Sequence, residues 1–241
     1  MRNIKIVLEY DGTDYSGWQY QPDRKTVQGE IEKALGKVLN EKIKVTGAGR
    51  TDQGVHALGQ VANFFTNRAL PPEKIRAGMN ALVPNDIYAR QIAEVASDFN
   101  SRFSARSKIY RYQLRWEPSP IRNRYYWFVK YRLDFARIEE TVSLLKRRHD
   151  FRWFSVADDD KQKTADCDLM DISLTNETSE IIIKIEADRF LRHMVRGIVG
   201  FLIDVARGRF KPRQADDVFA GKLRDLFFAP PQGLFLMEVK Y

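Results

Sequence analysis

The chain has 241 residues, of which 44% are hydrophobic and 12% aromatic, so it can bury a sizeable core and is not a disordered chain. Forty lysines and arginines outnumber 32 aspartates and glutamates, and the formal charge of +8 favours a polyanionic partner. Cys167 is the single cysteine, which excludes a disulfide framework and a thiolate zinc cluster. With no signal-peptide core and no apolar run long enough to span a bilayer, the sequence predicts a cytoplasmic protein without a membrane partner.

Periodic patterns in the first half predict six elements in the order βαββαβ. Alternating apolar residues indicate strands, a three-to-four-residue apolar stripe after Thr26 indicates a capped helix, and Pro71 and Pro72 open a second helix. Residues 11–24 form a loop between the first strand and the first helix. The predicted strands cover 4–10, 43–46, 60–66 and 87–95, and the predicted helices cover 27–38 and 71–82.

The second half repeats this order of elements without repeating the residues. The predicted strands cover 108–116, 169–174, 181–187 and 234–239, and the predicted helices follow a cap at Asp134 and cover 191–207 and 214–220. Two βαββαβ sets predict an α+β fold of two ferredoxin-like halves, joined into one mixed, mainly antiparallel sheet with helices on one side and a central cleft. We expect residues 1–104 to carry the aspartate loop described next, and residues 105–241 to complete the cleft.

Glycines, an arginine, a carboxylate and a histidine are concentrated in one segment, residues 47–57. If this backbone is extended, Arg50 and Asp52 lie on the same face, and the guanidinium keeps the carboxylate ionised. A structural interpretation stays open, in which Asp52 bonds its own turn and Arg50 is solvated. The segment lacks both the phosphate-loop pattern and the third glycine of a dinucleotide-binding turn, which argues against a nucleotide cofactor.

Other charged groups give weaker predictions. On a helix, Arg189, Arg192 and Arg196 form one basic edge, either solvated or facing a ligand. The acidic triplet at 158–160 is either a site for a hard cation or a solvated turn. The three histidines fit no metal-ligand spacing, and neither the zinc deaminase nor the serine hydrolase signature is present, so we expect no metal and no cofactor.

The segment Gly49–Ala57 reads GRTDQGVHA and resembles the G-R-T-D-x-G-V-H-A signature of the tRNA pseudouridine synthase A (TruA) family. This signature is long and mostly specified. Further segments resemble that family in the same order along the chain, so the resemblance extends from Tyr10 to Leu236. These segments are Tyr10–Gln19, Phe103–Tyr112, Phe190–Gly200 and Ala229–Leu236.

The resemblance implies a tRNA pseudouridine(38-40) synthase, an isomerase that converts uridine to pseudouridine in the anticodon stem-loop of tRNA. It also implies a homodimer that needs no cofactor. Asp52 is then the catalytic nucleophile, with Arg50 and Arg196 holding it ionised. Arg50 also fills the gap left by a flipped-out base. Tyr110 is a catalytic residue that stacks on the uracil and can act as acid or base at the ribose or the ring, and Leu234 contacts the substrate.

Two alternatives remain beside this prediction. One is a non-catalytic RNA-binding protein of ferredoxin-like halves, in which Arg50 and Asp52 only shape a loop. The other, a glycosidase or phosphodiesterase, needs a second placed carboxylate or a metal, and the sequence shows neither. The sequence also leaves open whether Trp18 packs on its own domain or contacts RNA.

Overall fold

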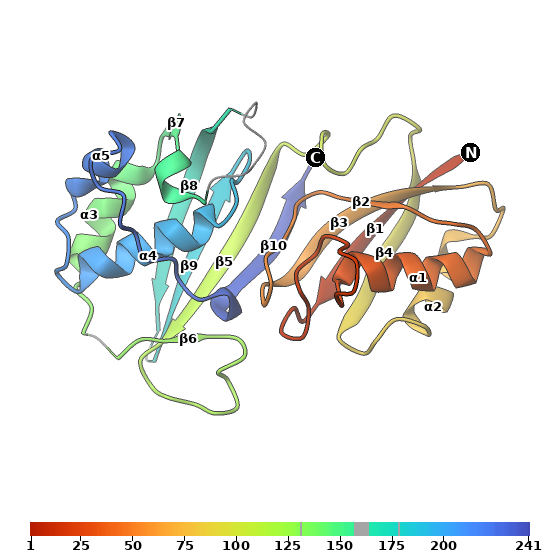
Figure 1. Cartoon of the computed structure of the whole chain (residues 1–241), viewed down its shortest axis with the longest axis horizontal. Helices are drawn as coiled ribbons and strands as arrows, with labels where there is room; N and C mark the ends of the chain where they lie inside the picture. The colour runs from red at the N-terminus through yellow and green to blue at the C-terminus, as the bar shows by residue number, and fades with distance from the viewer. Residues whose placement is uncertain (131, 157–163, 178) are drawn as a thin grey trace. The chain divides into compact units, whose positions relative to one another are not determined.

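The structure is a computed structural model that describes residues 1–130, 132–156, 164–177 and 179–241. These residues form two compact units (Figure 1). One unit consists of Met1–Arg106 together with Phe235–Tyr241, and the other of Ser107–Leu234. The predicted halves, 1–104 and 105–241, differ from these units chiefly in the final strand, which groups with the first unit.

The first unit follows the predicted order βαββαβ. Its strands pair in the order β4-β1-β3-β2, so the first and third strands are neighbours, as in a ferredoxin-like unit. All three pairings are antiparallel. The elements are β1 (Arg2–Tyr10), α1 (Val27–Leu39), β2 (Val45–Gly47), β3 (His56–Thr66), α2 (Pro72–Asn80) and β4 (Ile87–Val95), with β10 (Leu234–Lys240) added at its end.

Helices α1 and α2 cover the apolar face of this sheet (Figure 1). Along β1 the residues Ile4, Ile6 and Leu8 are fully buried, because alternate side chains of a strand point to the same face. Helix α1 begins as predicted, since the hydroxyl of Thr26 accepts a hydrogen bond from the Gly29 N–H at 3.3 Å. The alternation and the cap therefore account for the position of both elements.

Strand β3 begins earlier than predicted, at His56 instead of residue 60. Its first residues pair in parallel with β10, Phe235 lying opposite His56 and Leu236 opposite Ala57. A Cβ at Gly59 would lie 2.2 Å from the Met237 carbonyl oxygen, so glycine is what allows β10 to come this close. The sequence predicted a loop between the strands at 43–46 and 60–66, whereas Gly59 lies in β3 and serves a strand contact.

The second unit contains more elements than one βαββαβ set. Its strands pair in the order β5-β9-β8-β7, and the two-residue β6 pairs with β5 in parallel. The short strands β6 and β7 were not predicted. The elements are β5 (Ser107–Arg115), β6 (Trp127–Phe128), α3 (Phe135–Leu145), β7 (Arg148–Asp150), β8 (Asp166–Asn176), β9 (Glu180–Ala187), α4 (Met194–Ala206) and α5 (Gln214–Phe219), with 3-10 turns at Arg152–Phe154 and Pro231–Gly233.

Helix α4 is the buried centre of the second unit and lies beside α3 (Figure 1). Two of its glycines allow neighbouring backbone to touch the helix. A Cβ at Gly197 would lie 2.2 Å from the Phe154 carbonyl oxygen, and one at Gly200 would lie 1.7 Å from that of Phe227. The helix is therefore packed between the backbone at Phe154 and the backbone at Phe227, and a side chain at either glycine would push that backbone away.

The predicted fold class is confirmed as α+β, with mixed and mainly antiparallel strand pairing. The mixed character comes from the parallel pairs β3–β10 and β5–β6. The antiparallel pairs are β1–β3, β1–β4, β2–β3, β5–β9, β7–β8 and β8–β9. The central cleft stays a prediction.

Candidate functional site

The glycine-rich signature, residues 47–57, connects β2 to β3 through a tight turn. The Val55 N–H donates to the Asp52 carbonyl at 3.2 Å, which closes a four-residue turn. Gly54 occupies its third position with φ of +77°, a value that glycine adopts without strain. Asp52 therefore opens the turn and is held by its own backbone bond.

Exposure alternates along the three residues that lead into this turn. Arg50 is exposed, Thr51 is buried, and Asp52 is half-buried. The Thr51 hydroxyl hydrogen-bonds the Tyr10 hydroxyl at 2.8 Å, and its carbonyl accepts from the Trp18 N–H at 3.0 Å. An inward Thr51 fits the prediction that the residues on either side of it share the outer face.

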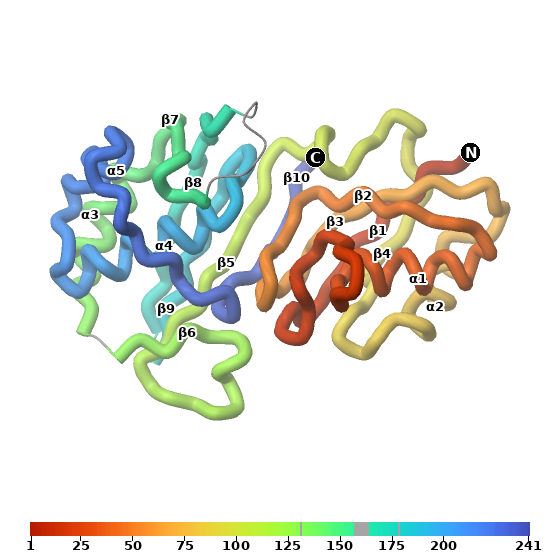
Figure 2. The backbone as a smooth tube through the Cα atoms, viewed as in Figure 1, coloured from red at the N-terminus to blue at the C-terminus, as the bar shows by residue number. Residues whose placement is uncertain are grey.

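The loop between β1 and α1, residues 11–26, lies against the signature at two points and is followed as the first loop of the tube in Figure 2. A Cβ at Gly12 would lie 1.9 Å from the Val55 carbonyl oxygen, and one at Gly17 would lie 2.8 Å from that of Thr51. Both glycines are required because backbone touches backbone there. We call residues 11–18 the strap.

Trp18 packs inside the first unit. The residue is 2% exposed, and a Cβ at Gly47 would lie 2.6 Å from the indole. It also lies 6.0 Å from the Tyr10 ring, and burial raises the pKa of the Tyr10 phenol despite hydrogen bonds from Thr51 and Gln60. Of the two interpretations of Trp18, the structure supports packing on its own domain.

Tyr110 lies in the middle of β5 and is 7% exposed. Its ring meets Phe190 edge-on, with centroids 4.9 Å apart and an interplanar angle of 82°. Tyr112, two residues on, is fully buried, and its hydroxyl donates to the Pro230 carbonyl at 2.7 Å. Burial raises the pKa of Tyr112, partly opposed by the charge of Arg196.

Arg196 occupies the first turn of α4 and is tied to the segment before β10. Its Nε donates to the Ala229 carbonyl at 2.7 Å, and the Ala229 N–H donates back to the Arg196 carbonyl at 3.0 Å. Leu234, the predicted substrate contact, is 4% exposed and follows Gly233, where a Cβ would lie 2.9 Å from the Tyr112 ring. The guanidinium thus has a fixed orientation before any ligand binds.

The predicted basic edge of Arg189, Arg192 and Arg196 is wrong, because α4 begins only at Met194. His193 has φ of +62°, in the left-handed region, so the helix cannot extend backwards through it. Arg189 instead lies in irregular backbone, where its N–H donates to the Asp188 carboxylate at 2.7 Å. Only Arg196 of the three is helical.

The structure therefore divides the predicted site residues between the two units. Arg50 and Asp52 lie in one loop of the first unit, and Tyr110, Arg196 and Leu234 lie in the second. The meeting of these two sets stays a prediction. The sequence analysis assigned no role to four supporting residues, although each lies in a segment that resembles the family. These are Tyr10, Thr51, His56 and Tyr112.

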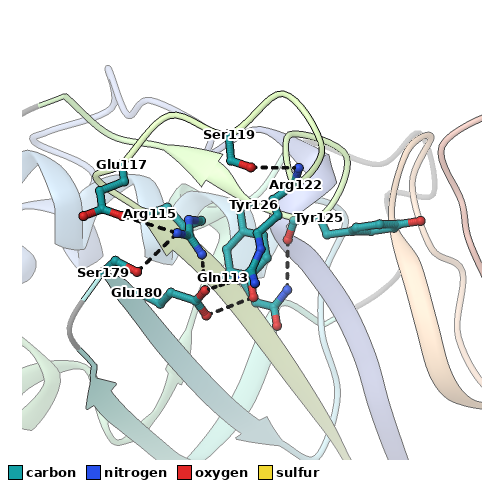
Figure 3. A network of polar contacts seen from close by, with 9 residues as sticks. All are labelled: Gln113, Arg115, Glu117, Ser119, Arg122, Tyr125, Tyr126, Ser179 and Glu180. Carbon is teal, nitrogen blue, oxygen red and sulfur yellow. Dashed lines mark hydrogen bonds and ion pairs between the residues drawn. The ribbon is translucent and has the colours of Figure 1, made fainter.

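A separate polar cluster closes the loop between β5 and β6 (Figure 3). The Glu180 carboxylate pairs with Arg115, accepts from Arg122 at 2.6 Å and accepts from the Tyr126 hydroxyl at 2.9 Å. Gln113 donates from its side chain to the Tyr125 carbonyl at 2.9 Å. Burial and the Glu180 carboxylate raise the pKa of Tyr126. These contacts fix the loop on one end of the sheet.

Within the described ranges, no group of three or more His, Cys, Asp or Glu side chains is arranged to hold a metal ion. The acidic triplet at 158–160, predicted as a cation site or a solvated turn, lies outside those ranges. Nor does any helix in the described part of the chain have the length and apolar character needed to cross a membrane.

Comparisons with known proteins agree on one family. A family model described as tRNA pseudouridine synthase matches residues 6–104 and 144–241. The tRNA pseudouridine synthase A proteins of Thermoanaerobacter sp. (strain X514) and Chlorobium limicola (strain DSM 245) are each 41% identical, over 245 and 244 residues, with 100% of both chains aligned.

Solved structures add little to this. An archaeal box H/ACA sRNP Nop10–Cbf5 complex aligns at 10% identity with a TM-score of 0.36, over 83% of this chain and 43% of that chain, and so low a score carries no argument. The family model covers most of the chain, and the relatives align along its full length. The chain therefore belongs to the tRNA pseudouridine synthase family.

Proposed function

We propose that this protein isomerises uridine to pseudouridine at positions 38, 39 and 40 of the anticodon stem-loop of tRNA, with Asp52 as the catalytic nucleophile. The observation that carries the proposal is the signature turn, which presents a half-buried carboxylate next to an exposed arginine on a backbone fixed at both ends. The names of the full-length relatives support tRNA as the substrate.

The reaction needs no external energy and no cofactor. The bond between N1 of the uracil and C1′ of the ribose breaks, the base turns, and C5 bonds to C1′. The proton leaves C5, and N1 gains one. A carboxylate suits this chemistry because it can attack the sugar or the ring, or act as a base. The attacked atom stays open.

The other site residues prepare the base and the carboxylate. A target uridine inside a stem must be flipped out, and in the proposal Arg50, whose side chain is exposed, fills the gap. Arg196 supplies a positive charge that keeps Asp52 ionised in the proposed active site. Tyr110, held by Phe190, stacks on the uracil, and Leu234 lines its pocket.

The excess of lysine and arginine supports binding to the phosphates of tRNA. Such binding weakens steeply as salt rises, and an affinity independent of salt would contradict it. We also propose that the protein is a cytoplasmic homodimer and that one tRNA spans both subunits. Sedimentation of the protein with and without tRNA tests this stoichiometry.

Release of tritium from tRNA labelled with [5-³H]uridine tests the activity on mixing with protein alone. We expect release by the wild-type protein, none by Asp52→Asn, and wild-type release by Asp98→Asn, which changes an exposed aspartate of the same unit. Release by Asp52→Asn at the wild-type rate would refute the role of Asp52. Binding of tRNA without release by the wild-type protein would support the non-catalytic RNA-binding alternative.

A further inference from the structure

The imidazole of His56 is buried at the junction of the strap and the signature turn. The residue begins β3, is 1% exposed, and stacks on the Phe235 ring of β10 with centroids 4.6 Å apart and planes 24° apart. Stacking fixes the plane of the ring. The ring nitrogens therefore have fixed directions within the first unit.

One nitrogen of this ring faces two neighbours from the strap. The Gly12 N–H lies 3.1 Å from Nδ1 and donates to it, and the Asp11 Oδ1 lies 3.0 Å from the same atom. Nδ1 accepts from Gly12 only when it carries no proton, and it donates to Asp11 only when it carries one. The two hydrogen bonds are therefore alternatives: the neutral ring with its proton on Nε2 accepts from Gly12, whereas the imidazolium carries a proton on Nδ1 and donates to Asp11.

The choice between them is transmitted to the turn that carries Asp52. Gly12 lies directly against the Val55 carbonyl, where a Cβ would be only 1.9 Å away. The Val55 N–H in turn bonds the Asp52 carbonyl at 3.2 Å. A shift of Gly12 away from His56 thus changes the support of the residue that opens the turn.

We propose that His56 is a positioning residue for Asp52. With Nδ1 unprotonated it holds Gly12, and through Gly12 the catalytic turn. With Nδ1 protonated it pairs with Asp11 instead and releases Gly12. This proposal rests on the proposed role of Asp52 in catalysis.

The groups around His56 favour such a switch. From the strap, the Asp11 carboxylate also accepts from the N–H and hydroxyl of Thr13, at 2.9 and 2.6 Å, so it is already held in place. From β1, Tyr10 stays neutral near pH 7, because burial raises its pKa. From β10, Phe235 does not titrate. The carboxylate of Asp11, 3.0 Å from Nδ1, therefore stabilises an imidazolium here.

The test is the pH dependence of the single-turnover rate, measured by tritium release from labelled tRNA between about pH 5 and 8, where histidine ordinarily titrates. We expect the wild-type rate to fall as the pH falls through this range. His56→Asn supplies an amide oxygen that accepts from Gly12 but does not titrate. It should keep the rate at pH 8 within about threefold and lose the acid limb.

Two further variants make the test independent of how well His56→Asn folds. His56→Leu removes the acceptor and should lower the rate at least about tenfold at all pH values, with the KM for tRNA unchanged. Asp11→Asn removes the charge that favours the imidazolium, so the acid limb should move to lower pH. A merely structural histidine would change thermal stability without moving this limb.

The outcomes separate the two proposals. If Asp52→Asn is active, the proposed function fails. If Asp52→Asn is inactive but His56→Asn and Asp11→Asn both keep the wild-type acid limb, only the role of His56 is overturned. Loss of the limb in His56→Asn, or its displacement in Asp11→Asn, supports the positioning role.

Discussion

Adding one methyl group at Gly12 tests whether the strap sets the geometry of the signature turn, which carries the proposed nucleophile Asp52. In Gly12→Ala the new Cβ would lie 1.9 Å from the Val55 carbonyl oxygen, whereas an ordinary contact begins at 3.4 Å. About 1.5 Å must therefore be opened between the two backbones, and neither side is a flexible side chain. The strap or the turn has to move.

A displacement of this size is large for a reacting group. A misplacement of about 1 Å can cost about 10²-fold in rate, and overpacking costs about 1–3 kcal/mol of stability. We expect Gly12→Ala to fold, to bind tRNA, and to release tritium at least about 100-fold more slowly than the wild type in single turnover. Thermal unfolding followed by circular dichroism checks that the protein is folded at the assay temperature.

Gly36→Ala is the matched control. It makes the same chemical change in α1 of the same unit, where the new Cβ would lie 3.3 Å from the Glu41 carbonyl oxygen. Alanine is also the better helix former, by about 1 kcal/mol. A rate for Gly12→Ala within twofold of that of Gly36→Ala would refute the claim that the strap positions Asp52.

Three further predictions concern the second unit. Tyr112→Phe removes a hydroxyl that donates to a carbonyl at 2.7 Å, so urea unfolding should show a loss of about 1–2 kcal/mol, and a loss below about 0.5 kcal/mol would contradict this. Glu180→Ala removes the nearer of two carboxylates that pair with the buried Arg115, leaving Glu117 at 3.7 Å, and should cost about 3 kcal/mol. A loss no larger than that of Glu140→Ala on the exposed face of α3 would contradict this. Burial raises the pKa of Cys167 to about 12, so the thiol stays protonated at pH 8. It should therefore react with a thiol reagent only when urea unfolds the protein. Rapid labelling of the native protein would contradict this prediction.

The regular elements of the first unit were predictable because their patterns are local. The alternation in β1 and β4 and the cap at Thr26 each depend on neighbouring residues. The start of β3 at His56 was missed, because it depends on pairing with β10. His56 lies opposite Phe235, which is more than 170 residues away in the sequence. Such a contact leaves no periodic signal in a glycine-rich segment.

In the second unit, the errors have a different cause. Arg189, Arg192 and Arg196 have helical spacing, but the left-handed backbone at His193 makes the helix begin at Met194. The first two arginines therefore lie outside it. Strands of two or three residues such as β6 and β7 are too short to show a period. Patterns predict which residues can form an element, while caps and distant contacts determine where it begins.

The residues of the candidate site could be predicted from the sequence, but the contacts that support them could be predicted only in part. The signature motif indicated Arg50 and Asp52, and the resemblance supplied Tyr110, Arg196 and Leu234. The position of the strap could not be predicted, because Gly12 contacts Val55 through the backbone, and a backbone contact leaves no pattern of side chains in the sequence. For the same reason the sequence alone suggested no role for His56.

The pairing of β10 with β3 has a consequence for biosynthesis. A ribosome makes residues 56–66 early, yet their parallel partner at 235–236 follows only after the whole of 107–234 has been translated. One end of β3 in the nascent first unit therefore stays without its β10 partner until the ribosome has translated the second unit. An unpaired strand edge of this kind is where chaperones or premature association would act on the growing polypeptide.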